Sequence, residues 1–369
     1  GCFGQILSGV LADKVGHQRV LTALMVANAV LLNIQGQTRS IEVLLLVRLL
    51  LGLAAPYALS LTWVGIAAPL AYLARAMANT IMIAQVSVGV GGIIAGLLRG
   101  HDYATACGVL SVAPTLNIVL LLGARPPRAT SSPAGNDSCL RSILDVLYLP
   151  AFVAVLWCIF VHGSYYGLCL TLPPYILKEV HRQQESAVGR TFQLAGFLVV
   201  PCHLFLTPRL SSWKPAQSGQ ALLILLALFV AALGFFGEQG LWPLYMLTVA
   251  SYCSNFVCLG LCNFLVMLAA KKYRPSAVGM MNGVARCMFT LGAAVAPAGA
   301  ESLRAASGAW LPCLILVAFC GLSASFFGLA RLATELPPPK LMTNFLLYFF
   351  PFFCYFFVIG WPQSCHHQN

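Results

Sequence analysis

Two arginines lie inside long apolar stretches of this sequence, Arg48 and Arg286. A charged side chain in such a stretch is costly to bury, so by default each is a candidate functional group. The planar guanidinium forks of two such arginines favour an anionic ligand, or an anionic side chain, as their partner. The alternative for Arg48 is a structural arginine that snorkels toward the end of its apolar stretch.

Other polar side chains interrupt the same kind of stretch. Asn282 lies one helical turn before Arg286, on the same side of the helix expected there. His162 can titrate near neutral pH, which suits proton coupling, although packing is the alternative role. Of Tyr165 and Tyr166, we expect one to face a binding cavity; a tyrosine near the end of a span can also be an interface anchor.

The composition requires that these residues be positioned by membrane helices. The chain of 369 residues is 59% hydrophobic and 8% charged, with a mean hydropathy of +0.84, which excludes an ordinary soluble domain. Apolar runs of about 18 or more residues suit helices that cross a bilayer, because every backbone group must be paired there. We therefore predict an all-α, multi-pass integral protein of the plasma membrane or an organelle membrane. The apolar runs cover 1–12, 20–36, 42–67, 77–98, 103–122, 146–170, 188–207, 218–236, 241–269, 277–299 and 308–331.

The charges indicate an orientation. Thirteen of the twenty-one Lys and Arg residues fall on the side of the polar hairpin Asp13–Arg19, which the positive-inside rule makes cytosolic. This distribution argues against a nucleic-acid partner. The fourteen cysteines form no CxxC pair, and neither a nucleotide-binding loop nor a catalytic constellation is visible. We expect no enzyme activity, no cofactor and no metal.

A central segment rich in Pro, Gly and Ser divides the chain into two halves. Small residues at Gly89, Gly92 and Gly96 predict close helix packing in the first half. The predicted units are an incomplete N-terminal bundle at 1–122, a cytosolic linker at 123–145, a C-terminal bundle at 146–331 and an atypical aromatic tail at 332–369.

The hairpin and its flank carry a recognisable pattern in Gly9, Asp13, Gly16 and Arg19. It resembles the signature loop between helices 2 and 3 of the major facilitator superfamily. The residues around Arg48 resemble the helix 4 pattern of the same family. This resemblance implies two six-helix bundles, here with helix 1 and part of helix 2 missing.

The resemblance also implies roles for these residues. The loop at Asp13 would dock on helix 11, near 277–279, and stabilise one access state as a conformational switch. Arg48 would line a central cavity and serve proton coupling or the binding of anionic groups. The alternative for Asp13 is a carboxylate that is simply solvated in its loop.

The function implied is secondary active transport of a small organic solute by alternating access. The pattern is most similar to the 12-spanner drug:proton antiporter family, which suggests proton-coupled efflux of a drug or metabolite. An organic-anion uniporter or symporter is the alternative that the two arginines favour. A receptor-like protein without transport activity, or a nonfunctional fragment, is the alternative from another class. The partners expected are the substrate, protons and the lipid bilayer.

Overall fold

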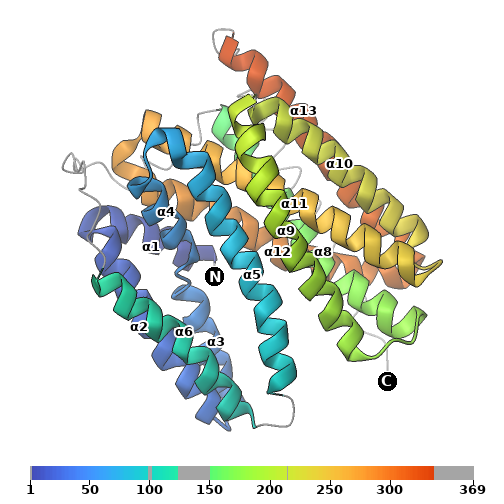
Figure 1. The fold of residues 1–369 in the computed structure, drawn as a ribbon, viewed down its shortest axis with the longest axis horizontal. Helices are drawn as coiled ribbons and strands as arrows, with labels where there is room; N and C mark the ends of the chain where they lie inside the picture. Colours follow the sequence, from blue (N-terminus) through green and yellow to red (C-terminus); the bar gives the residue numbers. More distant parts are fainter. Residues whose placement is uncertain (1, 99–101, 124–149, 214, 336–369) are drawn as a thin grey trace.

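The computed structural model describes residues 2–98, 102–123, 150–213 and 215–335, which form helices and no strand. This is the predicted all-α class (Figure 1). The helices of the first half are α1 (Cys2–Val15), α2 (His17–Gln37), α3 (Ile41–Leu53), α4 (Tyr57–Ala67), α5 (Leu73–Leu97) and α6 (Tyr103–Gly123). Those of the second half are α8 (Pro150–Tyr175), α9 (Glu185–Trp213), α10 (Pro215–Phe236), α11 (Leu241–Tyr273), α12 (Val278–Ser307) and α13 (Trp310–Glu335).

Eight helical segments of the described chain are long and apolar enough to cross a membrane. Many of their large apolar side chains are exposed, as a surface in contact with lipid requires. The protein is therefore a multi-pass integral membrane protein. The eight segments are His17–Gln37, Ile41–Ala67, Tyr103–Gly123, Phe152–Val180, Ser186–Ser211, Gln217–Phe236, Leu241–Tyr273 and Pro275–Arg304.

The run predicted as one span at 42–67 is a single crossing built from two helices, α3 and α4. Pro56 lies in the break between them; it lacks a backbone N–H, and its ring clashes with the preceding turn of a continuous helix. The side chain of Asn28 on α2 donates a hydrogen bond to the Ala54 carbonyl at 2.6 Å. This bond satisfies a backbone group freed by the break, as the membrane interior demands.

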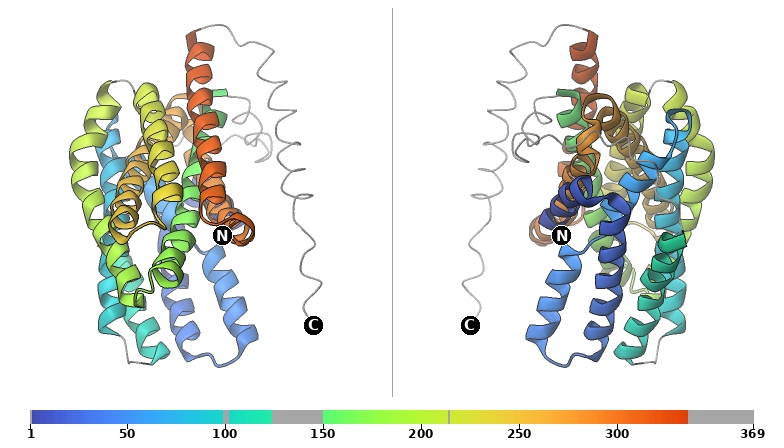
Figure 2. Two further views of the ribbon diagram at one scale, coloured as in Figure 1. Left: turned by 90° about the vertical axis from the view of Figure 1, so that its right-hand side faces the viewer. Right: turned by 90° about the vertical axis from the view of Figure 1, so that its left-hand side faces the viewer.

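The helices pack as two groups that lie side by side (Figures 1 and 2). In the first group α2 packs against α6, and in the second α8 packs against α12, α11 and α13. The groups meet where α1 lies on α12, where α5 lies on α9 and α11, and where α4 lies on α12. The largest buried apolar cluster is formed mainly by the second group.

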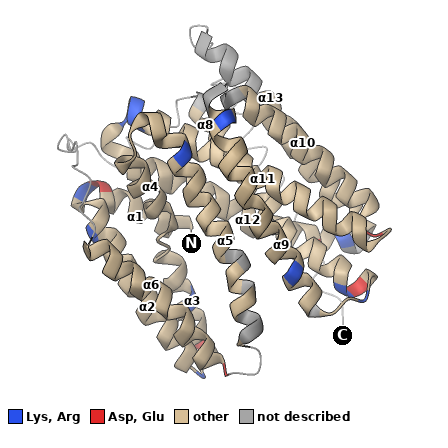
Figure 3. Ribbon diagram, viewed as in Figure 1, with Lys and Arg blue, Asp and Glu red and all other residues tan. Residues whose placement is uncertain are grey.

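The connections between helices define two ends of the molecule. We call the end that carries the α1–α2, α4–α5 and α11–α12 connections the loop face; hydrogen bonds join these connections to each other. At the other end, His181 Nε2 lies 3.0 Å from the Gly237 carbonyl oxygen, and Glu238 accepts from the Ala309 N–H at 3.3 Å. Lys and Arg lie mainly toward the ends of the helices (Figure 3).

The predicted units can be compared with the described residues. The first half ends with α6 at Gly123 and the second begins with α8 at Pro150. Nearly all of the predicted linker, and the tail from residue 336 onward, lie outside the described residues. The last helix, α13, continues to Glu335, four residues beyond the predicted 331, and Pro337, a residue that disfavours helix, follows two positions later in the sequence. Gly89, Gly92 and Gly96 lie on α5, but their surroundings are outside the described part.

Candidate functional site

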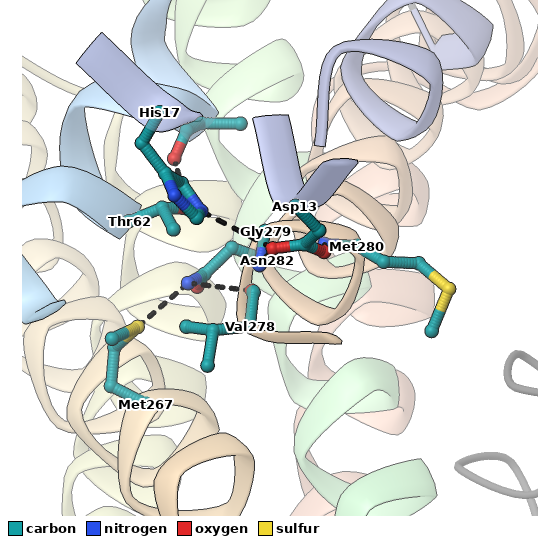
Figure 4. Close-up of polar contacts among 9 residues, drawn as sticks. Asp13, His17, Thr62, Met267, Val278, Gly279, Met280 and Asn282 are labelled. Atoms are coloured by element: carbon teal, nitrogen blue, oxygen red, sulfur yellow. Dashed lines mark hydrogen bonds and ion pairs between the residues drawn. The ribbon is translucent and has the colours of Figure 1, made fainter. Parts of the chain in front are cut away.

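The Asp13 carboxylate joins the two halves at the loop face. It accepts a hydrogen bond from the Gly279 N–H at 2.9 Å and another from the Met280 N–H at 2.8 Å (Figure 4). Both donors belong to the first turn of α12, where backbone N–H groups have no partner within the helix. The positive end of the helix dipole also favours a carboxylate at this position. Asp13 therefore caps a helix of the other half of the molecule.

Glycines allow the two backbones to approach closely enough for this contact. A Cβ atom at Gly9 would lie 2.3 Å from the Gly279 carbonyl oxygen, and one at Gly279 would lie 2.6 Å from the Gly9 oxygen. A Cβ at Gly283, one turn further along α12, would lie 2.5 Å from the Gln5 oxygen. The contact between α1 and α12 is thus backbone against backbone, which no larger residue permits.

The turn after α1 orients the rest of the hairpin. Gly16 has φ of 111°, in the left-handed region that favours glycine, and the chain reverses there into α2. His17 Nε2 lies 3.2 Å from the Asp13 carboxylate, while Arg19 is exposed on α2. The structure thus brings Gly9 and Asp13 to the contact with α12, places Gly16 at the exposed turn and leaves Arg19 outside the contact.

A second contact between the halves lies on the same face. Lys271, in the last turn of α11, donates to the Ala68 carbonyl at 2.8 Å, just beyond the end of α4. A cation at the carboxyl end of a helix complements its dipole, so this contact mirrors the carboxylate of Asp13 at the amino end of α12. A Cβ at Gly65 of α4 would lie 2.2 Å from the Met267 Cε of α11, so the two helices are also tightly packed. Sequence reasoning assigned Lys271 only a role in topology.

Asn282 braces this region from within the second half. Its Nδ2 donates to Met267 Sδ at 2.6 Å and to the Val278 carbonyl at 3.4 Å (Figure 4). The side chain is buried against α11. Asn282 therefore ties α12 to α11, while Arg286 lies one turn further from the loop face.

Arg286 is a buried cation held by aromatic rings. Its side chain is on α12, about 12 Å along the helix from Val278, and the residue is only 7% exposed. Its guanidinium lies 3.9 Å from the ring centre of Tyr57, from the first half, and 4.8 Å from that of Phe289. Within the described residues, Nη1 has no hydrogen-bond partner and the guanidinium has no carboxylate partner.

The two neighbouring tyrosines of α8 have different surroundings. Tyr165 is fully buried and donates to Ser251 Oγ on α11 at 2.6 Å. The ring of Tyr166 lies 5.8 Å from that of Phe289, which also contacts Arg286. We call Arg286, Tyr57, Phe289 and Tyr166 the Arg286 cluster.

Sequence reasoning missed Tyr57 and Phe289, two members of this cluster. Phe289 lies three residues after Arg286 on the same helix, a spacing that could have indicated it. Tyr57 has no such local signal, because it comes from a different helix in the other half. One further hydrogen bond between the halves joins Tyr252 of α11 to Gln85 Oε1 of α5 at 2.6 Å.

Two predicted site residues lie elsewhere. Arg48 is exposed on α3, and no described contact joins it to Arg286. His162 is fully buried on α8, with Nδ1 2.7 Å from Asn255 Oδ1 of α11. In the described part of the chain, the residues with the character of metal ligands that come together are His162, Cys258 and Cys262.

Comparisons with known proteins give the same architecture. The sequence profile of the family described as Major Facilitator Superfamily matches residues 1–297. A solved structure titled "Crystal structure of the human organic anion transporter MFSD10 (TETRAN)" is similar, with a TM-score of 0.73 over 88% of this chain and 80% of that one. The identity is 17%, so this likeness concerns the fold. A search of curated proteins found no match.

Proposed function

Because the chain belongs to the major facilitator superfamily, we propose that it is a secondary transporter that carries a small organic anion across its membrane by alternating access. Members of such a fold bind substrate between two bundles and expose the site to one side at a time. We propose no enzyme activity. The proposal of transport rests on the residues of the Arg286 cluster.

The observation behind the proposal is the buried guanidinium of Arg286, which has no anionic partner among the residues that the structure describes. A buried charge that lacks a partner is strongly unfavourable, so the site is completed by an anion that arrives from outside. A carboxylate or a similar group fits the fork of an arginine. The rings of Tyr57, Phe289 and Tyr166 offer apolar surface to the rest of an organic solute.

The cluster is also suitably located. Tyr57 belongs to the first half and Arg286 to the second, so a ligand bound at the cluster would contact both halves. The contacts of Asp13 and Lys271 close the molecule at the loop face. Passage of substrate through that face requires these contacts to break, and their re-formation would return the transporter to the closed state. The Lys and Arg distribution makes this face cytosolic in our proposal.

The test is transport by the purified full chain in reconstituted vesicles. We expect saturable uptake from a panel of radiolabelled aromatic carboxylates, with little uptake of amines of matched size. Arg286→Lys keeps the charge and loses the fork, so it should lower uptake at least about tenfold, a loss of about 1.4 kcal/mol. Arg286→Ala should abolish uptake, whereas Arg190→Ala, which alters an exposed arginine of α9, should not change it.

Two results would contradict this proposal. One is a well-folded Arg286→Ala variant that transports carboxylates at the wild-type rate. The other is a wild-type preference for the matched amines, which would favour drug efflux instead. An imposed pH gradient in the same vesicles tests proton coupling in either direction, and the absence of any uptake would favour the receptor-like alternative.

A further inference from the structure

A buried group of sulfur and nitrogen atoms joins α8 to α11, apart from the Arg286 cluster. One ring nitrogen of His162 and the sulfurs of Cys258 and Cys262 all lie within 4.8 Å of one another. All three residues are 0% exposed. Cys258 and Cys262 are four residues apart on α11, which places both on the same face of the helix, toward α8. Two thiols and an imidazole are ligands typical of a metal site, and here they come from two helices.

The histidine is oriented as a metal ligand would be. Its Nδ1 lies 2.7 Å from the carbonyl oxygen of the Asn255 side chain, an acceptor, so the ring proton is at Nδ1. The free lone pair is then on Nε2, which is buried without a hydrogen-bond partner in the described structure. Histidines that bind metals characteristically donate their other N–H to a carbonyl or carboxylate, which fixes the ring. An unsatisfied imidazole nitrogen in this interior is otherwise unfavourable.

We propose that His162, Cys258 and Cys262 bind one Zn²⁺ ion that fastens α8 to α11. The negative charges of two thiolates balance the charge of a divalent ion, and the imidazole is neutral. The bound site is therefore neutral as a whole, as a low-dielectric interior favours. Binding exchanges two thiol protons for the metal and releases them to solvent. In the metal-free arrangement, Cys258 donates a weak hydrogen bond to the Gly219 carbonyl at 3.6 Å, which the metal replaces.

Small side-chain movements can bring the ligand atoms to the distances that a zinc ion requires. Zn–S and Zn–N bond lengths of about 2.3 and 2.0 Å in a tetrahedral site put ligand atoms roughly 3.5–3.8 Å apart. Atoms up to 4.8 Å apart therefore need to approach each other by at most about 1.0–1.3 Å. The three side chains leave one position of a tetrahedral site to a fourth ligand, and a neutral one such as water keeps the bound site neutral.

The experiment measures metal binding, which does not depend on transport. Purified full chain in detergent is incubated with ZnCl₂ or CoCl₂, washed, and analysed by mass spectrometry of the metal and by optical absorption. We expect about one ion per chain, with cobalt giving a thiolate-to-metal charge-transfer band and the visible bands of a tetrahedral site. Zinc should also raise the melting temperature, because it binds only the folded chain tightly.

Matched variants assign the ligands. The double substitution Cys258→Ser/Cys262→Ser should lose the ion and the charge-transfer band, and His162→Gln should weaken binding and shift the visible bands. Cys169→Ser, which alters another buried thiol of α8, should bind as the wild type does. Wild-type protein that retains no zinc, or a cobalt spectrum without the charge-transfer band, would overturn the site. Both of these results are measured on the wild-type chain, so they hold even if the double variant fails to fold.

Discussion

Asp13 is the residue through which the hairpin contacts the other half of the molecule. Its two hydrogen bonds to the start of α12 are charge-assisted and partly buried. In our proposal they break when the loop face opens. Such a carboxylate at a helix amino end contributes up to about 2 kcal/mol. Loss of this contact should change the balance between access states more than the binding of substrate.

We predict that Asp13→Asn lowers the maximal transport rate and leaves the substrate affinity within about twofold. A shift of about 1–2 kcal/mol changes the ratio of the two states by roughly 5- to 30-fold. Concentration-dependent uptake by vesicles separates the two quantities. Asp102→Asn is the matched control, because Asp102 accepts from Thr105 N at 3.3 Å, at the start of α6 in its own half. Equal transport rates for Asp13→Asn and the wild type would remove Asp13 from the mechanism.

For Arg48 we predict that substitution changes transport without changing the stability of the fold. Its side chain is exposed on α3, so Arg48→Ala should fold and melt as the wild type does. If Arg48 binds substrate, Arg48→Ala should abolish binding; if it tunes a protonatable group, binding should persist with a shifted pH dependence. Arg48→Lys keeps the charge but loses the planar fork, and should also impair transport. Wild-type uptake by Arg48→Ala across pH would make Arg48 a structural arginine.

At the scale of the elements, the contact between α1 and α12 depends on glycine. The Gly9 and Gly279 backbones touch, and Asp13 reaches α12 only because neither carries a side chain. The crossing made by α3 and α4 depends instead on a proline. There Pro56 interrupts the helix and so allows Tyr57, the first residue of α4, to present its ring to Arg286.

Two Gly→Ala substitutions on α12 should have opposite effects. A Cβ at Gly279 would lie 2.6 Å from the Gly9 oxygen and 2.8 Å from Asp13 Oδ1, so Gly279→Ala should separate α1 from α12 and lower the melting temperature. A Cβ at Gly299 meets nothing within 4 Å, so Gly299→Ala should stabilise the helix by about 0.5–1 kcal/mol. Thermal unfolding in detergent compares the two. A Gly279→Ala variant as stable as Gly299→Ala would mean that the close contact is not needed.

At the scale of the whole molecule, the two halves are held together on the loop face by contacts of opposite chemistry. Asp13 caps the amino end of α12 and Lys271 caps the carboxyl end of α4. Beneath them, Gly65 and Met267 bring α4 and α11 into contact, and Tyr57 meets Arg286 nearer the middle. In the proposed mechanism of alternating access, these halves separate at the loop face.

A reversible cross-link tests this requirement. A Cβ at Gly65 would lie 3.1 Å from Met267 Cγ, so Gly65→Cys combined with Met267→Cys has the proximity that a disulfide needs. Mild oxidation should stop transport by the double variant, and a reductant should restore it. Each single variant, treated in the same way, is the control for the native cysteines. Unchanged transport by a chain shown to be cross-linked would contradict a mechanism in which the loop face opens.

Local sequence alone determined much of this protein. Hydropathy predicted where the eight membrane-spanning segments of the described chain lie, because each span must satisfy its backbone within itself, whatever its neighbours are. The pattern Gly9, Asp13, Gly16 indicated a tight turn between two helices, and Arg286 was conspicuous because a charge in an apolar run is rare. Each of these signals is contained within one or two helical turns.

Only the tertiary structure decided which side chains meet. Tyr165 and Tyr166 are adjacent in sequence, yet one bonds to Ser251 and the other joins the Arg286 cluster, because successive residues point to different sides of a helix. The sequence predicted no metal site, since its cysteines form no CxxC pair; the packing of α8 on α11 sets His162 beside Cys258 and Cys262. Tyr57 and Arg286 likewise come from different halves. Such contacts depend on the rotation and packing of whole helices, which a one-dimensional pattern does not specify.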